Sequence, residues 1–260
     1  MTVMDTVFHE SGYVVVPGVF SPADIAPMRS LISDLVLWKA RQIGGAVEQR
    51  ITQMTADDRP HAGMAALAEH NAEAMRQVTD RLIVSGTFLG LAHHDRIRAI
   101  AAQYTAAPSI DFISLSEPFF RVDVPRHLLG ERNLFSLPWH QESGYYTRAV
   151  SHTTSIVLNL AIYDCAIDNG CIELVRGSHR QGALQHEHVY MSPTDKRHFR
   201  AVLPESVAEP SQIAYGILRA GDVLVNHFNT IHRSGVNDSE RVRYTMLVRA
   251  SNMLADDFTV

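Results

Sequence analysis

The second half of the chain is a succession of short apolar runs separated by turn residues. After Pro108 these runs are rich in Val, Ile, Phe and Tyr, and they read IDFISL, FFRVDV, SIVLNLAIYD, CIELV, DVLVNHF and RVRYTMLVRAS. Between them lie turn signals such as Asp168-Asn169-Gly170, Arg176-Gly177-Ser178, Gly221-Asp222 and Asn237-Asp238-Ser239. Many short strands with this punctuation predict a β-sandwich or barrel.

The first half has a different pattern. Gly12–Phe20 predicts one strand, and the segment that follows predicts a helix with Ser21 as N-cap, Pro22 in its first turn and Gly44-Gly45 at its end. Further helical patterns extend to Pro108. We therefore expect a single domain over residues 1–260, mainly β with flanking α-helices, with the helices mostly in 21–107 and the β core mostly in 108–252. The polar segment 181–215, with its three prolines, is expected to form an active-site lid.

Composition excludes several classes of protein. The formal net charge of −5 argues against a nucleic-acid-binding protein, which usually has a basic excess. Two cysteines, Cys165 and Cys171, are too few for a disulfide framework, so a reducing cytoplasm is the expected location. The N-terminus lacks the apolar region of a secretory signal, and no apolar run approaches the length of a membrane span. We expect no membrane or nucleic-acid partner.

The stretch LPWHQESGYY, residues 137–146, places a histidine and a carboxylate two positions apart. In an extended chain His140 and Glu142 would point to the same side, with Gln141 pointing away. A third ligand would come from the later segment NHFNTIHRSGVNDSERVRY, in which His227 and His232 are both candidates. Two imidazoles and one carboxylate form the facial triad of non-haem Fe(II) oxygenases, which leaves positions open for a 2-oxo acid and O₂.

A 2-oxo acid also has a distal carboxylate, for which an arginine is the usual partner. Arg241 and Arg243 follow the second histidine segment, and in a strand both would lie on one face. Periodicity therefore does not separate these two candidates.

Four segments together resemble the phytanoyl-CoA dioxygenase family of Fe(II)/2-oxoglutarate-dependent oxygenases, whose core is a double-stranded β-helix, or jelly roll. They are GYVVVPGVFSPADI, WHQE (W-H-Q-D in the family), DNGCIELVRGSHRQG and GDVLVNHFNTIHRSGVNDSERVR. They occur in the family's order and at its spacings, over most of the chain. Arg176 stands where the family usually has proline.

The resemblance implies a set of site residues. The metal ligands would be His140, Glu142 and His232, and the arginine for 2-oxoglutarate would be Arg243, eleven residues after His232. Ser234 would contact the same distal carboxylate. The resemblance further implies that Gln141 lies beside the co-substrate, in tension with its outward direction in a strand, and that Asn159 stands where the family often has tryptophan near the co-substrate. The expected co-substrate site therefore consists of Arg243, Ser234, Gln141 and Asn159.

The implied activity is oxidation of a small molecule, with Fe(II), 2-oxoglutarate and O₂ as cofactor and co-substrates and with release of succinate and CO₂. Hydroxylation is the default outcome, and desaturation, ring formation or epimerisation are alternatives. Glu142 replaces the usual Asp but keeps the carboxylate, so a working ligand with altered geometry is expected. It also argues against halogenation, because halogenating relatives have a small residue at this position.

The substrate itself is not encoded in a motif. The run FFRVDVP resembles bacterial members associated with surface sugars or small metabolites, so anionic or sugar-like substrates are candidates and Arg121 is expected to face the pocket. A basic run in the expected lid, comprising Lys196, Arg197, His198 and Arg200, is either a solvated loop or a clamp for a substrate anion. Two other functions stay open: a non-redox, cupin-like isomerase or sensor, and a catalytically silent binding relative.

Overall fold

The computed structural model describes residues 3–116, 118–128, 137–146, 150–190 and 199–260. Its α-helices are α1 (Val3–Ser11), α2 (Pro22–Ile43), α3 (Gly45–Thr52), α4 (Met64–His70), α5 (Ala72–Ile83), α6 (Gly86–Ala92) and α7 (Asp95–Tyr104). Its strands are β1 (Tyr13–Val16), β2 (Ile113–Leu115), β3 (Phe119–Asp123), β4 (Ile156–Ala161), β5 (Ile172–Val175), β6 (Glu187–Tyr190), β7 (Phe199–Val202), β8 (Ile213–Gly216), β9 (Val223–His227), β10 (His232–Ser234) and β11 (Arg243–Asn252).

The strands form two main antiparallel sheets. The larger sheet has the order β1-β9-β4-β11-β2, with β3 also paired to β11, and the smaller sheet has the order β10-β5-β8. Strands β6 and β7 pair only with each other, as a hairpin. Within the described residues the two main sheets do not close into a continuous barrel. The predicted jelly-roll core with flanking helices is confirmed.

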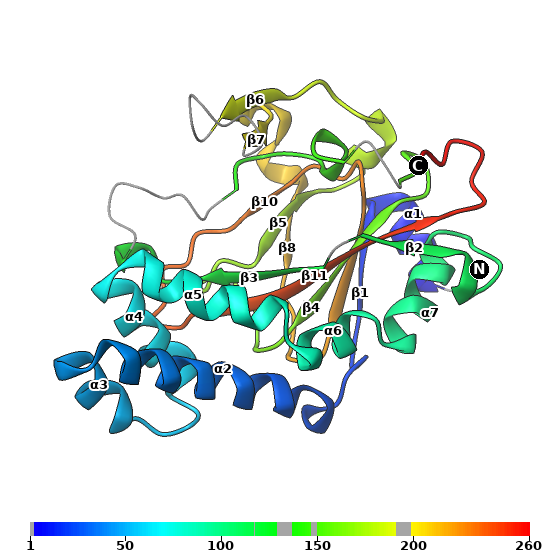
Figure 1. Ribbon diagram of the computed structural model, residues 1–260. Coiled ribbons are helices and arrows are strands. Elements are labelled where there is room, and N and C mark those ends of the chain that lie inside the picture. The colour runs from blue at the N-terminus through cyan, green and yellow to red at the C-terminus, as the bar shows by residue number, and fades with distance from the viewer. Residues whose placement is uncertain (1–2, 117, 129–136, 147–149, 191–198) are drawn as a thin grey trace.

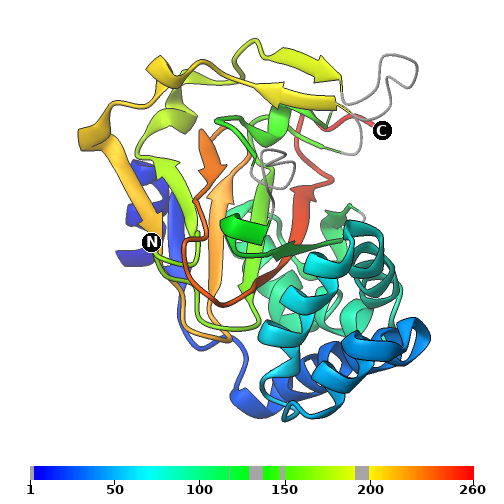
Figure 2. The same cartoon turned by 90° about the vertical axis from the view of Figure 1, so that its left-hand side faces the viewer.

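Alternating side chains give the larger sheet two different faces. On β4, Ile156, Leu158 and Leu160 belong to the main apolar core, together with helix residues such as Ile32 and Leu82. Helices α2 to α7 cover this face of the sheet, and the smaller sheet lies on the other side (Figures 1 and 2). The opposite face of the larger sheet therefore points into the interior between the two sheets.

The polar residues of β3 and β11 lie on that interior face. Phe120, Val122, Tyr244, Met246 and Val248 pack in the main apolar core. The residues between them, which alternate to the other side, are Arg121, Asp123, Arg243, Thr245, Leu247 and Arg249. Charged side chains are thus concentrated where the two sheets face each other.

The helix that follows β1 begins as its sequence predicts. Ser21 caps α2, and its side chain and that of Asp24 satisfy each other's backbone N–H in a capping box. Gly44 ends the helix with φ of 73°, a left-handed conformation that favours glycine. Within the described residues, no helix combines the length and the apolar character that a bilayer span requires.

The segment 181–215 contains more regular structure than a loop. It includes the β6–β7 hairpin, two 3₁₀ turns (Glu205–Val207 and Pro210–Gln212) and the start of β8. The hairpin lies at one end of the two sheets (Figure 2). Of the basic run in this segment, Lys196, Arg197 and His198 lie outside the described residues, whereas Arg200 lies on β7.

Candidate metal and co-substrate site

Residues 140 and 142 do not belong to a regular strand, although the sequence suggests an extended run. His140 forms an isolated antiparallel bridge with His232, and a 3₁₀ turn spans Glu142–Gly144. In the bridge each backbone N–H donates to the other residue's carbonyl over 2.9 Å. Because directly opposed residues project their side chains to the same side, the two imidazole rings lie with centroids 4.2 Å apart.

Three side chains from distant parts of the sequence converge at this bridge. One potential ligand atom of each of His140, Glu142 and His232 lies within 4.8 Å of the others. Glu142 Oε1 is 3.9 Å from His232 Nε2, and all three residues are buried. The trio could hold a metal ion, and it is the only such group of three among the described residues.

The backbone fixes which nitrogen of each imidazole is available to a metal. His140 Nδ1 lies 2.8 Å from the carbonyl oxygen of Pro138, and His232 Nδ1 lies 2.8 Å from that of Thr230. A carbonyl only accepts hydrogen bonds, so each Nδ1 carries the proton and each Nε2 keeps its lone pair. Metal-binding histidines characteristically have a hydrogen-bonded second nitrogen of this kind.

The protonation states also suit a cation. Burial, reinforced by the neighbouring His232, lowers the pKa of His140 to about 3, and burial lowers the pKa of His232 as well. Burial alone would raise the pKa of Glu142, but Arg249, followed by His232 and His140, opposes burial, and together they hold this pKa below its ordinary value. At neutral pH the trio is therefore two neutral imidazoles and one carboxylate, which fits a divalent metal ion.

His227 lies elsewhere and is committed to other contacts. Its Nδ1 accepts from the backbone N–H of Asn229 over 3.0 Å, so Nε2 carries the proton and donates to Thr153 O over 3.2 Å. Its ring packs against Phe8 and His179. Neither nitrogen is left with a lone pair for a metal.

Arg243 is the most deeply buried arginine of the interior face, with 1% of the residue exposed. Its Nη2 lies 2.8 Å from Asp123 Oδ2, and its Nη1 donates to Thr245 Oγ1 over 3.1 Å. The contact with Asp123 is an ion pair by distance but lacks hydrogen-bond geometry, so Nε and Nη2 have no hydrogen-bond acceptor among the described residues. These donors suit a further carboxylate.

Asp123 joins two arginines in the interior. Arg121 Nη2 lies 2.7 Å from Asp123 Oδ1, and Arg121 Nε donates over 3.3 Å to Oδ2, the oxygen that Arg243 also approaches. Burial opposes ionisation of Asp123, but Arg121 and Arg243 together hold its pKa below the ordinary value. Arg121 thus faces the interior between the sheets; the sequence-based expectation that it faces the substrate pocket stays a prediction.

Arg241 lies outside this cluster. Strand β11 begins only at Arg243, so the two arginines are not on one strand face as the sequence pattern suggested. Arg241 is exposed, and its Nη2 contacts His61 Nε2 at 3.0 Å.

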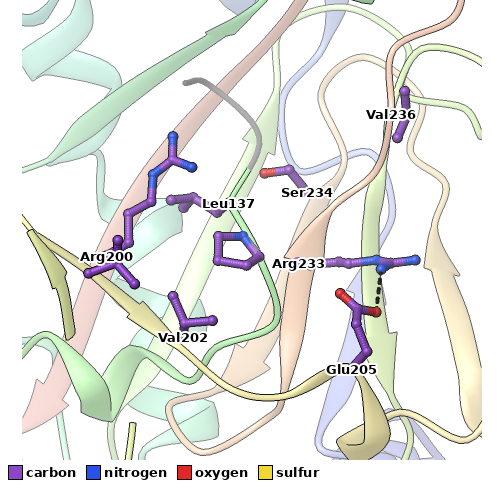
Figure 3. A pocket seen from close by; sticks show the side chains of 9 residues that line it. Leu137, Arg200, Val202, Glu205, Arg233, Ser234 and Val236 are labelled. Atoms are coloured by element: carbon purple, nitrogen blue, oxygen red, sulfur yellow. Dashed lines mark hydrogen bonds and ion pairs between the residues drawn. The ribbon is translucent and has the colours of Figure 1, made fainter. Parts of the chain in front are cut away.

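Ser234 lines a cavity of about 450 Å³ beside β10. The walls of this cavity come from Leu137, Pro138, Val189, Arg200, Val202, Glu205, Arg233, Ser234 and Val236. Figure 3 shows Arg200 on one side and the ion pair between Arg233 and Glu205 on the other. The β6–β7 hairpin therefore contributes one wall of this cavity, through Val189, Arg200 and Val202.

Gln141 points away from the two histidines and into hydrogen bonds with backbone. Its Nε2 donates to the carbonyls of Gly182 (2.9 Å) and Asn229 (2.7 Å), and its Oε1 accepts from the N–H of Leu184 over 2.8 Å. The side chain is fully buried. Two of these contacts are to the chain that leads into the hairpin, and the third is to the segment between β9 and β10.

Asn159 lies on the interior face of β4, paired with Leu224 and Leu247 of the neighbouring strands. Its Nδ2 donates to Asn226 Oδ1 over 2.9 Å, while its buried Oδ1 has no hydrogen-bond partner among the described residues. The residue is thus placed on the interior face of the larger sheet.

Two interior residues were missed in the sequence. Arg249 Nε donates to Glu142 Oε2 over 3.0 Å, and Asp123 joins Arg121 to Arg243. Strand alternation would have placed both on the face of Arg243 and Arg121, because Arg249 is six residues after Arg243 and Asp123 is two after Arg121, but it does not give their partners.

Comparisons with known proteins identify a family and similar folds. The family model described as phytanoyl-CoA dioxygenase (PhyH) matches residues 8–245. No curated protein matches the chain in sequence.

Three solved structures are similar in fold. EctD from S. alaskensis, with 2-oxoglutarate and 5-hydroxyectoine, has a TM-score of 0.60 at 15% identity and covers 100% of this chain and 80% of its own. The carbocyclase SnoK from nogalamycin biosynthesis has a TM-score of 0.58 at 20% identity, and the match covers 96% of this chain and 83% of SnoK. The epimerase SnoN, in complex with Fe³⁺, alpha ketoglutarate and nogalamycin RO, has a TM-score of 0.53 at 17% identity, and the match covers 96% of this chain and 82% of SnoN. At these identities the similarity is one of fold.

Proposed function

Because this chain belongs to the phytanoyl-CoA dioxygenase family, we propose that it oxidises a small molecule with Fe(II), 2-oxoglutarate and O₂, releasing succinate and CO₂. His140, Glu142 and His232 hold the iron in this proposal. The observation that supports it best is the pair of imidazoles whose Nδ1 atoms are bound to carbonyls, which leaves both Nε2 atoms facing Glu142. When bound, the iron supplies the oxidising chemistry, and the protein supplies the ligands and a buried site.

The co-substrate site of the proposal is centred on Arg243. Its guanidinium donors at Nε and Nη2 would bind the distal carboxylate of 2-oxoglutarate, with Ser234 as a second donor. Asn159 is proposed to lie near the co-substrate. Gln141, whose amide is hydrogen bonded to backbone, is proposed to act from the edge of this site by holding the hairpin.

Hydroxylation is the proposed outcome. The similar structures include an epimerase and a carbocyclase, so this fold is found with several reaction outcomes. For the substrate we propose a small anionic or sugar-like molecule. Arg200 in the cavity wall supports an anionic group on it. The buried, unpaired Cys165 and Cys171 support a cytoplasmic location.

Anaerobic titration of the protein with Fe(II) and then 2-oxoglutarate tests the proposal before any substrate is known. We expect a weak visible charge-transfer band that requires both additions, followed by slow succinate formation when O₂ is admitted. A metal-binding isomerase or sensor would bind Fe(II) without developing the band. A silent binding relative would bind neither, and either result would contradict the proposal.

A further inference from the structure

A buried arginine holds the carboxylate of the candidate metal site. Arg249 Nε lies 3.0 Å from Glu142 Oε2, and Arg249 Nη2 lies 3.5 Å from Glu142 Oε1. The side chains are only 11% and 4% exposed, respectively. The guanidinium also lies over the ring of Tyr146, 4.7 Å from its centroid. The arginine is therefore held on two sides before any ligand is bound.

The contact divides the work of the two carboxylate oxygens. Oε2 accepts the shorter hydrogen bond from Arg249, whereas Oε1 is directed to the histidines and lies 3.9 Å from His232 Nε2. A carboxylate oriented in this way turns Oε1, which has only the longer 3.5 Å contact with Arg249 Nη2, towards the histidines and keeps Oε2 on the arginine. The orientation exists in the protein itself and does not require the ion.

A glutamate needs such a restraint more than an aspartate does. Its side chain has one more rotatable bond, and its terminal torsion has a broad energy minimum, so an unrestrained carboxylate samples many orientations. A guanidinium is a rigid, planar donor and fixes a carboxylate more tightly than the flexible ammonium group of lysine. Partners outside the ligand set commonly tune metal sites in this manner.

We propose that Arg249 is the positioning residue that makes Glu142 an effective metal ligand in place of the shorter aspartate. The inference rests on the proposed iron site and deepens it. The positive charge of Arg249 by itself repels a divalent cation, so its benefit arises from orientation. If only the charge of Arg249 mattered, removing the arginine would tighten metal binding. If its orientation of Glu142 matters more, removing it weakens metal binding.

The test is metal affinity, measured without co-substrate, substrate or turnover. The full-length protein is titrated anaerobically with Co(II), whose visible absorption reports its coordination number, and then with Fe(II). Arg249→Met should weaken binding by about 10-fold or more, the range typical of such outer partners. Arg249→Lys keeps the charge but not the planar fork, and should weaken binding at least as much. Arg241→Met, an exposed arginine outside the interior cluster, is the matched control and should leave the affinity unchanged.

A double-mutant cycle separates orientation from a general structural effect. An aspartate at position 142 is too short to keep the contact, so Arg249→Met added to Glu142→Asp should change the affinity less than about 2-fold. An equal loss in both backgrounds, unchanged affinity in Arg249→Met, or tighter binding in that variant would overturn the proposal. If Arg249→Met does not fold, the metal affinity of Arg249→Lys, measured alone and combined with Glu142→Asp, tests the proposal by the same criteria.

Failure of the underlying function has a different signature. If the unsubstituted protein binds neither Co(II) nor Fe(II), the iron site and the role of Arg249 fall together. If it binds both and the Arg249 variants bind equally well, only the role of Arg249 is wrong.

Discussion

Two backbone carbonyls, those of Pro138 and Thr230, set the chemistry of the candidate metal site. By accepting from Nδ1 of His140 and His232, they fix both Nε2 lone pairs towards Glu142. The mutual backbone bridge between the two histidines then sets the distance between the rings. Main-chain contacts therefore set most of the ligand geometry, and this geometry does not depend on a bound metal ion.

Replacing either histidine should abolish the site. We expect His140→Ala and His232→Ala each to weaken Fe(II) binding by more than about 100-fold, because losing a ligand costs more than losing an outer partner. His227→Ala is the control, since both of its ring nitrogens are already engaged elsewhere. Anaerobic Fe(II) titration measures all three. Loss of binding in His227→Ala with retention in His232→Ala would show that the third ligand is misassigned.

Arg243 should act on the co-substrate and not on the metal. Arg243→Ala is expected to weaken 2-oxoglutarate binding by about 2–5 kcal/mol, which corresponds to about 30-fold or more, with Fe(II) affinity nearly unchanged. Arg241→Ala should have a much smaller effect, because its guanidinium contacts His61 outside the interior. Titration of the charge-transfer band with 2-oxoglutarate gives the dissociation constant of 2-oxoglutarate for each of the two variants. Equal losses in the two variants would refute the assignment.

The sequence predicted some of these residues better than others. The three candidate ligands and Arg243 came from spaced motifs, which persist whatever the exact strand boundaries are. The choice between Arg241 and Arg243 could not come from periodicity, because it depends on where β11 begins. The roles of Asp123 and Arg249 depend on β11 lying beside β3 and opposite the 3₁₀ turn at Glu142, and such pairings are not encoded locally.

At the scale of elements, the segment 139–145, which includes two of the candidate metal ligands, also holds the β6–β7 hairpin. Residues 140 and 142 face the metal site, while the odd-numbered residues between and around them contact the hairpin and the chain beside it. Trp139 O accepts from the N–H of Leu203, Gln141 binds Gly182 and Leu184, and the Tyr145 hydroxyl accepts from the N–H of Ala201. One short segment therefore builds the ligand set with one side and holds the hairpin with the other.

Gly144 makes this close approach feasible. A Cβ at that position would lie 2.9 Å from the Cβ of Ala201 and from the ring of His186. The sequence suggested a lid over 181–215 from its prolines and polarity, but the prolines did not predict the hairpin within it. Strand β6 is exposed throughout and β7 is mostly half-buried, so both lack the alternation on which strand prediction depends.

Breaking the Gln141 contacts should loosen the hairpin. Gln141→Met preserves the approximate size of the side chain but leaves the N–H of Leu184 and two carbonyls without a partner, at about 1–3 kcal/mol for each unsatisfied group. We expect faster amide hydrogen exchange in residues 184–190 and 199–202. Gln185→Met, at an exposed position nearby, is the control. Unchanged exchange in Gln141→Met would show that the hairpin is held by other contacts.

At the scale of the molecule, the helical layer is joined to the sheet by a buried histidine. His61, in the π-helical turn Arg59–Gly63, accepts a hydrogen bond from Arg241 just before β11, and its ring packs on Tyr163 with centroids 4.6 Å apart. Burial, followed by the charge of Arg241, lowers the pKa of His61 to about 4. Arg29 adds to this effect, whereas Asp58 opposes it. The neutral ring is thus a condition for the contact between the layers.

This predicts that acid weakens the fold through His61. Its folded-state pKa lies below the unfolded value near 6.5, so the unfolded chain takes up the proton first, and the stabilisation present above pH 6.5 is lost as the pH falls towards 4. At pH 5 the loss amounts to about 2 kcal/mol for this residue. Urea unfolding at pH 7 and pH 5 measures it, and His61→Gln should reduce the difference between the two pH values by that amount. His93→Gln, at an exposed position, should leave it unchanged. The same pH dependence in His61→Gln as in the unsubstituted protein would place the acid sensitivity elsewhere, with His227, whose burial also lowers its pKa to about 4, as the next residue to replace.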